Sequence, residues 1–234
     1  MCTVSWIYNN GIIICTSNRD EHVSRARALE VVDQANGDRV ITFPKDPRAR
    51  GTWIAHDNNG KMIVLLNGAT VAHHSGANYS KSRGIILMDI FSSDNIIEKT
   101  ESIDLKNIEP FTIIVFDASR LIEMKWDGSN KIIHDIAPTS NHLWSAVTLY
   151  DESIREFREE QFLSFTNKNE ISAAQIESFH RRKNSDPTQT ILINRKNGVR
   201  TFSITQIVIE LGHTNMKHIP ITHSELPELI ELAI

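Results

Sequence analysis

The sequence predicts a layered α+β fold in which two antiparallel sheets pack together and helices lie outside them. Four Asn-Gly or Asp-Gly turn signals, each flanked by isoleucine-rich, β-prone segments, predict the sheets. Amphipathic segments between these hairpins predict the helices. The 234 residues contain no internal repeat, low-complexity tract or linker, so we expect one domain over residues 1–234.

The first predicted hairpin occupies the start of the chain. Thr3–Tyr8 is the first strand, Asn9-Asn10-Gly11 is a tight turn, and Ile12–Ser17 is the returning strand. The Asn-Gly pair supplies the positive φ angles that a two-residue hairpin turn requires. Because a hairpin folds its far end back beside its start, we expect the residues after Ser17 to lie opposite Cys2.

Three further hairpins follow the same pattern. Their strands and turns are Gly51–Asp57 and Lys61–Asn67 around Asn58-Asn59-Gly60, Arg120–Trp126 and Asn130–Ile136 around Asp127-Gly128, and Thr190–Arg195 and Val199–Glu210 around Lys196-Asn197-Gly198. The less regular stretch Ser24–Arg50 contains Asn36-Gly37 and a turn at Pro44–Pro47. We predict a long functional or packing loop there.

Helices are predicted in the intervals between the hairpins. The predicted segments are Ser82–Phe91, a short helix capped by Asp94 that runs to Ile103, Asp151–Phe165, Ser172–Arg182, and a tail helix over Pro227–Ile234. The clearest is Asp151–Phe165, in which Ile154 and Phe157 oppose charged residues. These helices are expected to cover the outer faces of the sheets.

Composition excludes several classes of function. With 25 basic and 29 acidic residues the net charge is −4, so no basic excess favours nucleic acid as a partner. The longest aliphatic runs are far shorter than the ~20 residues of a spanning helix, and the N-terminus lacks the pattern of a secretory signal. Two cysteines cannot form a disulfide framework, so we expect a cytoplasmic protein with free thiols.

Cys2 is the first candidate for chemistry. Initiator methionine is commonly removed when residue 2 is small, and Cys2 would then carry both a thiol and a free α-amine. The amine, with a pKa near ~8, can accept the proton of a thiol with a pKa near ~8.5, and the thiolate can attack a carbonyl carbon. The alternative is an ordinary residue on an edge strand. Cys15, in an aliphatic strand, is predicted to be a small buried residue.

The second candidate is the tetrad Asn18-Arg19-Asp20-Glu21, which follows the first hairpin. A guanidinium group beside Cys2 would favour its thiolate, and a carboxylate would hold or orient the α-amine. The alternative is a solvated turn with a local ion pair.

Three motifs together resemble the NRDE family, which is also called the transport and Golgi organization 2 family. They are the Met-Cys start, the Asn-Arg-Asp-Glu tetrad, and Arg50-Gly51-Thr52-Trp53-Ile54-Ala55. The resemblance covers most of the chain, and its specific parts are the pattern from Cys2 to Glu21 and the Gly-Thr-Trp segment. The family is similar to the N-terminal nucleophile (Ntn) hydrolases, which implies a four-layer α-β-β-α sandwich of two antiparallel sheets.

The resemblance also implies roles for individual residues. Cys2 would be the nucleophile after loss of Met1, and Asp20 would hydrogen-bond the α-amine with Arg19 beside it. Asn67 and Gly68 match a Leu-x-Asn position whose backbone N–H groups would donate to an oxyanion, and Asn141 matches an amide donor of related cysteine amidases. A turn residue at Asn67 and a loop cap at Asn141 are the alternatives. Substrate contacts are expected from Trp53, Gly68 and His74.

Three departures from the family pattern limit what can be transferred. Arg50 and Ala55 stand where the family usually has glycine, and Pro187 stands where related sequences carry an arginine. The order Arg19-Asp20 also differs from the Arg-Asn-x-Asp of the amidases. These departures weaken the transfer of a bile-salt or penicillin amidase activity.

Metal and nucleotide motifs are absent from the sequence. The chain has 10 histidines, yet neither His-Glu-x-x-His nor Cys-x-x-Cys occurs, so no metal site is expected. Neither a P-loop nor Gly-x-Gly-x-x-Gly is present, and we expect no cofactor.

Two functions remain open at this point. The first is an Ntn-type cysteine hydrolase that cleaves an amide bond of a small acylated substrate. The second is a non-catalytic binding or transport protein for a hydrophobic ligand, such as haem or lipid, on the same scaffold. A trafficking or scaffold role fits the family name, but no residue pattern supports it. The sequence alone gives neither the substrate nor the oligomeric state.

Overall fold

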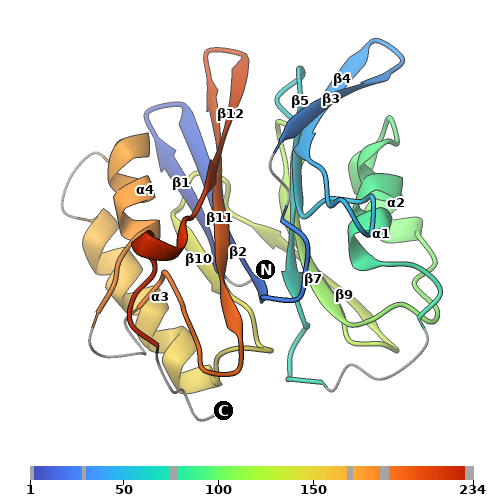
Figure 1. Cartoon of the computed structure of the whole chain (residues 1–234). Helices are drawn as coiled ribbons and strands as arrows, with labels where there is room; N and C mark the ends of the chain where they lie inside the picture. The colour runs from blue at the N-terminus through green and yellow to red at the C-terminus, as the bar shows by residue number, and fades with distance from the viewer. Residues whose placement is uncertain (1–2, 28–29, 74–78, 168–170, 185–189, 230–234) are drawn as a thin grey trace.

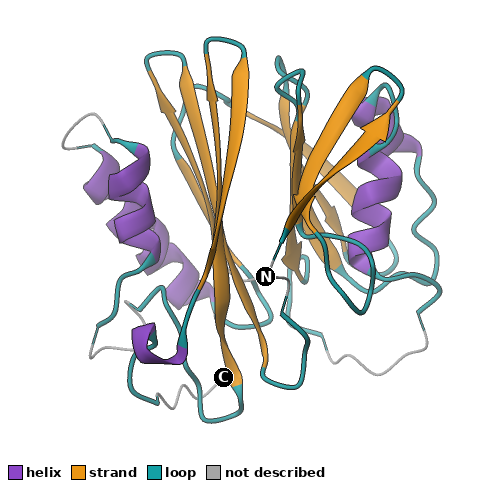
Figure 2. Ribbon diagram, turned by 45° about the horizontal axis from the view of Figure 1, so that its top comes forward, coloured by secondary structure: helices purple, strands orange, loops and turns teal. Residues whose placement is uncertain are grey.

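The computed structural model describes residues 3–27, 30–73, 79–167, 171–184 and 190–229. Within these residues two antiparallel sheets pack face to face, and helices cover their outer faces (Figure 1, Figure 2). The order of the layers is α-β-β-α, as Figure 2 shows most directly. The predicted fold class is therefore confirmed.

The first sheet has five strands in the part of the chain that is described. In spatial order they are β10 (His142–Ser145), β1 (Thr3–Asn9), β2 (Ile12–His22), β11 (Val199–Glu210) and β12 (His213–Pro220). Two helices, α3 (Glu152–Thr166) and α4 (Ala173–His180), pack on its outer face. The two N-terminal strands are thus neighbours inside the sheet. Strands from the C-terminal half of the chain flank them, with β10 beside β1 and with β11 and then β12 beyond β2.

The second sheet has seven strands among the described residues. In spatial order they are β3 (Val31–Asn36), β4 (Arg39–Pro44), β5 (Ile54–Asp57), β6 (Met62–Asn67), β7 (Phe111–Phe116), β8 (Leu121–Trp126) and β9 (Lys131–Ile136). The helices α1 (Arg83–Phe91) and α2 (Ile96–Ser102) pack on its outer face. Each strand pairs with its neighbour in sequence, and the hairpin signals predicted two of these pairings, β5 with β6 and β8 with β9.

Local sequence explains the ends of these elements. The first hairpin turns at Asn10 and Gly11, with φ angles of 49° and 88°, as a two-residue turn requires. The side chain of Asp151 accepts a hydrogen bond from the N–H of Ile154 and caps α3. Ser172 and Gln175 form a capping box at the start of α4.

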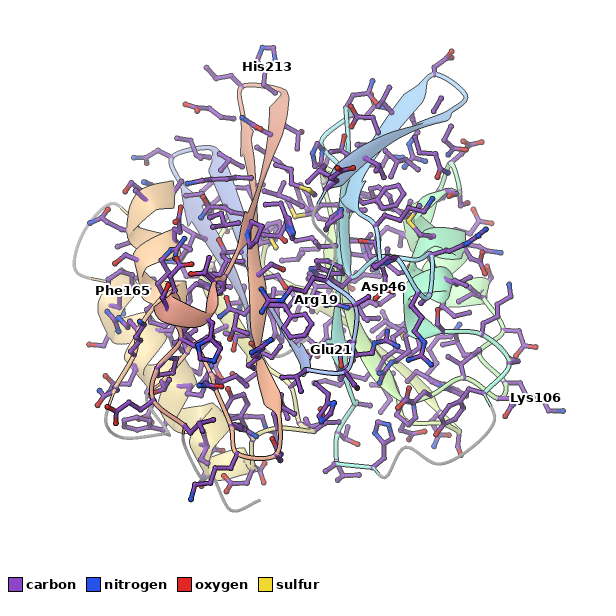
Figure 3. All side chains as sticks on the ribbon, in the orientation of Figure 1. Arg19, Glu21, Asp46, Lys106, Phe165 and His213 are labelled. Carbon is purple, nitrogen blue, oxygen red and sulfur yellow. The ribbon has the colours of Figure 1, made fainter. Side chains whose placement is uncertain are left out.

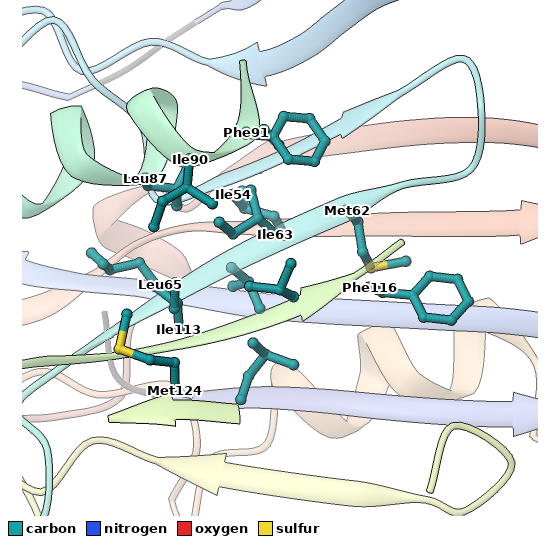
Figure 4. Packing of buried hydrophobic residues seen from close by; sticks show 14 of the residues in the cluster. Ile54, Met62, Ile63, Leu65, Leu87, Ile90, Phe91, Ile113, Phe116 and Met124 are labelled. Carbon is teal, nitrogen blue, oxygen red and sulfur yellow. The ribbon is translucent and has the colours of Figure 1, made fainter. Parts of the chain in front are cut away.

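Alternation along the first two strands divides the core into two layers. Val4, Trp6 and Cys15 belong to the cluster between the sheets, and Trp6 meets Phe116 of the second sheet edge-on at 5.1 Å between ring centroids. Figure 4 shows part of this cluster. Ile7 and its neighbour Ile14 instead face α3 and α4. Each large apolar side chain buried in this way contributes about 1.5–3 kcal/mol.

Cys15 is buried in the cluster between the sheets, as predicted. Burial raises the pKa of its thiol to about 12. A thiol with such a pKa is protonated at neutral pH, and Cys15 is consequently unreactive.

Three hydrogen-bonded polar side chains are buried on the other face of the first sheet, against α4. Ser5 Oγ lies 2.7 Å from Nε2 of His180, and Nδ1 of His180 lies 2.7 Å from Oδ1 of Asn18. The Asn18 amide donates to the carbonyl oxygens of His180 and Ile191. Burial, aided by the nearby charge of Arg158, lowers the pKa of His180 to about 3. A neutral imidazole therefore joins β1, β2 and α4.

Several predicted elements need correction. The predicted loop Ser24–Arg50 contains the hairpin β3–β4, whose two turn residues are Gly37 and Asp38, with Gly37 at a φ of 61°. The last hairpin pairs β11 with β12 around Leu211-Gly212, which carries no classical turn signal. Thr190–Arg195 forms an isolated bridge through Asn194 to Arg200 rather than a strand.

Smaller corrections concern helices and further strands. Asn95, not Asp94, caps α2, because its side chain accepts the N–H of Glu98. The predicted tail helix is absent over residues 227–229, which are irregular and follow a single 3-10 turn at His223–Glu225. The last five residues of that predicted helix lie outside the described part of the chain. The strands β7, β10 and β12 were not predicted. No helix in the described part of the chain is long and apolar enough to cross a membrane.

The buried His180 gives the fold a specific sensitivity to acid. The unfolded chain takes up a proton on this histidine near pH 6.5, whereas the native state takes it up only near pH 3. Stability is therefore lost as the pH falls below 6.5, and this group should remove about 2 kcal/mol between pH 6.5 and pH 5. Urea unfolding of wild type and His180→Gln across this range measures the effect.

The control is His134→Gln, which changes an exposed histidine. It should keep the steep pH dependence of the wild type, whereas His180→Gln should flatten it. An equally steep dependence in His180→Gln would show that His180 is not the group that titrates.

Candidate active site

The two central residues of the Asn-Arg-Asp-Glu tetrad lie on opposite faces of the first sheet. The register of β1 with β2 pairs Thr3 with Asn18, so Arg19 and Asp20 continue β2 beside the start of β1. Because successive side chains of a strand alternate, Arg19 points toward the second sheet and Asp20 points away from it. Thr201 Oγ1 donates to Oδ1 of the buried Asp20 at 2.5 Å.

Thr3, the first described residue, is held by a buried arginine from α3. Nη2 of Arg158 donates to Thr3 Oγ1 at 2.7 Å, Nε donates to Ser145 Oγ at 3.1 Å, and Nη1 donates to the carbonyl oxygen of Thr190 at 2.8 Å. The guanidinium carbon also lies 4.2 Å from the centroid of the Tyr150 ring. Arg158 is only 2% exposed and forms no ion pair with any described residue. Its positive charge therefore remains next to the start of β1.

A cavity of about 490 Å³ lies between the sheets, on the side of Arg19. Figure 3 shows Arg19, Glu21 and Asp46 in the space between the two sheets. Residues from β2, the 46–53 segment, β6, the start of α1 and the chain after β10 line the cavity. The full set is Arg19, Glu21, Arg25, Asp46, Ala49, Gly51, Thr52, Trp53, Leu65, Asn67, His73, Ser82, Arg83, Gly84, Glu109 and Thr148. It brings together three of the residues that the sequence predicted, namely Arg19, Trp53 and Asn67.

Asp46 fixes the position of the arginines on one side of this cavity. Its Oδ2 accepts from Arg19 at 2.9 Å and from Arg25 at 3.4 Å, while its Oδ1 accepts the N–H groups of Arg48 and Ala49. Burial opposes ionisation of Asp46, but these backbone N–H groups and the arginines outweigh it and hold the pKa of Asp46 below its usual value. Asp46 is therefore charged at neutral pH.

Charges on the other side of the cavity are also paired. Arg83 Nη2 lies 3.2 Å from Oε2 of Glu109, and Nε2 of His73 lies 3.2 Å from Oε1 of the same carboxylate. Burial lowers the pKa of Arg83, although Glu109 acts in the opposite direction. With Arg19, Arg25 and Arg83 against Glu21, Asp46 and Glu109, the lining is charged but balanced.

The Gly-Thr-Trp segment joins this cavity to α1 through a very close backbone contact. A Cβ atom on Gly51 would lie 2.4 Å from the carbonyl carbon of Gly84, so neither position accepts a larger side chain without movement. Thr52 Oγ1 lies 2.8 Å from the carbonyl oxygen of Pro44 and 2.9 Å from that of Ile54. These contacts set the direction in which the next residue, Trp53, enters the cavity.

Two buried donors in the cavity have no hydrogen-bond acceptor among the described residues. They are Nη1 of Arg19 and Nε1 of Trp53. Each side chain belongs to a residue that is 3% exposed, and the Arg19 guanidinium carbon lies 4.7 Å from the centroid of the Trp53 ring. A buried donor without an acceptor costs about 1–3 kcal/mol, and native proteins contain few of them.

Asn67 is the last residue of β6 and lines the cavity, whereas Gly68 follows the strand and is not part of the lining. The half-buried Asn67 side chain lines the cavity and hydrogen-bonds none of the described residues. The N–H of Gly68 is already used, because it donates to the carbonyl oxygen of Pro110 at 3.1 Å. Gly68 has a φ of 79°, and a Cβ there would meet Val147 at 2.4 Å, so its role is to let the chain turn.

Asn141 lies away from the other predicted site residues. Its Oδ1 accepts the N–H of Tyr8 at 3.0 Å, because the register of β1 with β10 pairs Trp6 with His142. Tyr8 is five positions along β1 from Thr3, or roughly 17 Å in an extended strand. Asn141 thus lies just before β10 and binds β1 at the end remote from Thr3.

Two predicted residues, Cys2 and His74, lie outside the described part of the chain. Within that part, no group of three or more metal-ligating side chains gathers at one point. The residues that sequence reasoning missed are Asp46, Arg83, Glu109 and Arg158. Arg158 gave no signal because it stands among the charged residues of an amphipathic helix, and the others come from segments without a motif.

Comparison with solved structures defines the class of fold. The chain is similar to the Caenorhabditis elegans ortholog of N-acylethanolamine-hydrolyzing acid amidase, with a TM-score of 0.61 and 13% identity over 89% of this chain and 92% of the other. It is also similar to a variant of conjugated bile acid hydrolase from Clostridium perfringens, with a TM-score of 0.52 and 10% identity over 94% and 92% of the two chains. The fold is that of the Ntn hydrolases.

The sequence model of one family matches this chain. The model described as Transport and Golgi organisation 2 matches residues 1–215, and the chain belongs to that family. A comparison with curated protein sequences found no match. The family and the Ntn-like fold that the sequence resembles are both confirmed.

The contact between Gly51 and Gly84 gives a direct test of how the cavity wall is held. Gly51→Ala should lower the free energy of unfolding by about 1–3 kcal/mol, because the new methyl group must push α1 away from the Gly-Thr-Trp segment. Gly84→Ala should have a similar effect, since its Cβ would lie 2.7 Å from the carbonyl oxygen of Thr52. Urea unfolding measures both, and unchanged stability in both variants would contradict the close approach.

Proposed function

We propose that this protein is an N-terminal nucleophile cysteine hydrolase that cleaves the amide C–N bond of a small acylated substrate, with Cys2 as the nucleophile after removal of Met1. The observation that carries the proposal is the meeting of three features at one end of the first sheet. These are the hydrogen bond from the buried Arg158 to Thr3, the adjacent residues Arg19 and Asp20 on the neighbouring strand, and the cavity that Arg19 lines. Family membership and the Ntn fold support it.

The anchoring of Thr3 supports a fixed nucleophile. A peptide bond joins Cys2 to Thr3, and consecutive Cα atoms lie ~3.8 Å apart, so Cys2 belongs to the immediate surroundings of Thr3. Arg158 binds Thr3 from the helix side, and Arg19 projects toward the second sheet from the neighbouring strand. Both positive charges favour the thiolate form of a nearby cysteine.

The reaction follows from the two groups that a terminal cysteine carries. The α-amine accepts the thiol proton as Sγ attacks the carbonyl carbon of the amide, and a tetrahedral intermediate forms. The resulting ammonium group gives its proton to the leaving nitrogen, the C–N bond breaks, and a thioester remains on Cys2. Water then attacks the thioester with the amine as base, releasing the carboxylic acid and the thiol. Asp20 is assigned to orient the amine.

Stabilisation of the oxyanion is assigned to Asn67. Its side-chain amide lines the cavity and is not used by any described residue. A donor of this kind is worth ~3 kcal/mol in the transition state. Asn141 and the N–H of Gly68 are left out of this role, because Asn141 binds Tyr8 at the far end of β1 and the N–H of Gly68 already donates to Pro110. The charged lining of the cavity also favours a polar acyl compound over haem or bulk lipid.

Acylation of the N-terminal residue tests the proposal. The protein should be isolated without Met1, as intact mass will show, and p-nitrophenyl acetate should then acetylate Cys2 at pH 8, with hydrolysis regenerating the free thiol. Peptide mass spectrometry locates the acetyl group. A panel of N-acyl amino acids and N-acylethanolamines, assayed for release of the amine, then identifies the substrate.

The second cysteine provides the matched control. Cys15→Ala should be acetylated as fast as wild type, because burial raises the pKa of Cys15 to about 12 and leaves it unreactive. Cys2→Ala should not be acetylated. Retention of Met1 together with equal labelling of Cys2→Ala and wild type would overturn the hydrolase proposal.

A further inference from the structure

Trp53 differs from the other fully buried indoles of the described chain. Trp6 Nε1 donates to the carbonyl oxygen of Pro138 at 2.9 Å, and Trp126 Nε1 donates to that of Ile108 at 2.9 Å. Trp53 is 3% exposed, yet its N–H has no acceptor among the described residues. Because buried polar groups are normally satisfied, an orphan donor that lines a cavity indicates a ligand that supplies the acceptor.

A second orphan donor stands beside the first. Nη1 of Arg19 has no acceptor in the described part of the chain, whereas Nη2 donates to Asp46 at 2.9 Å and the guanidinium group packs near the Trp53 ring. The two residues reach the cavity from different sheets, Arg19 from β2 and Trp53 from the segment before β5. Their donors are therefore held in place before any ligand arrives.

The charges around the donors restrict the chemistry of that ligand. Arg25 and Arg83 line the same cavity, but Glu21, Asp46 and Glu109 balance the arginines and already interact with them. The cavity therefore has little net charge to attract a highly charged group. Besides the Asn67 side chain and Nδ1 of His73, the buried polar groups of the lining without a partner among the described residues are the two N–H donors of Arg19 and Trp53. An oxygen acceptor of an acyl group satisfies both donors.

We propose that Arg19 Nη1 and Trp53 Nε1 form a two-donor subsite that binds an oxygen of an acyl group, carried either by a carboxylate or by an amide of the substrate. This inference deepens the proposed function, because it names the group that the cavity recognises and rests on that cavity being the substrate site. Trp53 determines specificity through its N–H and does not take part in proton transfer.

The key variant is Trp53→Phe, which keeps an aromatic ring against Arg19 but removes the N–H together with the volume of one ring. Loss of volume lowers the melting temperature of any buried Trp→Phe variant, but Trp53→Phe loses no satisfied hydrogen bond, so its decrease should be small. The matched control is Trp126→Phe, which loses a satisfied hydrogen bond and should lower the melting temperature. A decrease in Trp53→Phe as large as that in Trp126→Phe would overturn the assignment of an orphan donor.

Binding is measured by NMR titration with N-acetylglycine, which has an amide and a carboxylate, and with N-acetylglycinamide, which lacks the carboxylate. Both titrations use Cys2→Ser protein, so that a failure of hydrolysis does not affect the result. Trp53→Phe should weaken binding about tenfold, as expected for loss of one hydrogen bond to a ligand, and Trp126→Phe should not change it.

The two probes distinguish the source of the oxygen. Binding of both probes would assign the amide oxygen to the subsite, and binding of N-acetylglycine alone would assign the carboxylate. Binding of neither probe at millimolar concentration, or equal binding by wild type and Trp53→Phe, would overturn the subsite. In that case acetylation of Cys2 would still test the hydrolase proposal separately.

Discussion

The antiparallel register of β1 with β2 is the constraint on which the rest of the site depends. It pairs Thr3 with Asn18 and so brings the start of the chain beside the Asn-Arg-Asp-Glu tetrad. A shift of one residue would exchange the faces of all side chains on β2. Arg19 would then leave the cavity between the sheets, and Asn18 would lose His180. The hairpin turn at Asn10-Gly11 fixes this register at one end of the two strands. The apolar side chains that the strands bury in the two core clusters, one on each face, fix it along their length.

Buried charge and buried polarity are distributed differently on the two faces of the first sheet. Toward the helices, Arg158 is held by neutral oxygens and His180 stays neutral, so this side anchors the strands without an ion pair among the described residues. Toward the second sheet, Arg19 has a carboxylate partner in Asp46 and one donor that no described residue accepts. The arrangement toward the helices fixes the positions of the strands, and the arrangement toward the second sheet leaves an Arg19 donor available to a ligand in the cavity.

The cavity lowers the stability of the protein without ligand, although its wall is closely packed. Its wall depends on the contact of Gly51 with Gly84, where no side chain fits, and its donors include two that the described chain leaves unsatisfied. Unsatisfied donors lower stability in the absence of ligand, but donors already held in position lose little freedom when a ligand binds. This is the usual pattern at functional sites, where local destabilisation is tolerated by a well-packed surrounding core.

The sequence by itself determined the layered fold, most of the early hairpins and the tetrad, because turn chemistry and alternation are local properties of the chain. It did not predict β7, β10, β12 or the pairing of β11 with β12, whose partners are chosen by the sheets as a whole. It brought Arg19, Trp53 and Asn67 forward as candidates, but it also included Asn141, which the β1–β10 register carries to the far end of the strand. Only the tertiary structure decided that Asp46, Arg83 and Glu109 surround Arg19 and that Arg158 holds Thr3, because these contacts join segments far apart in the chain and depend on how two sheets and a helix pack.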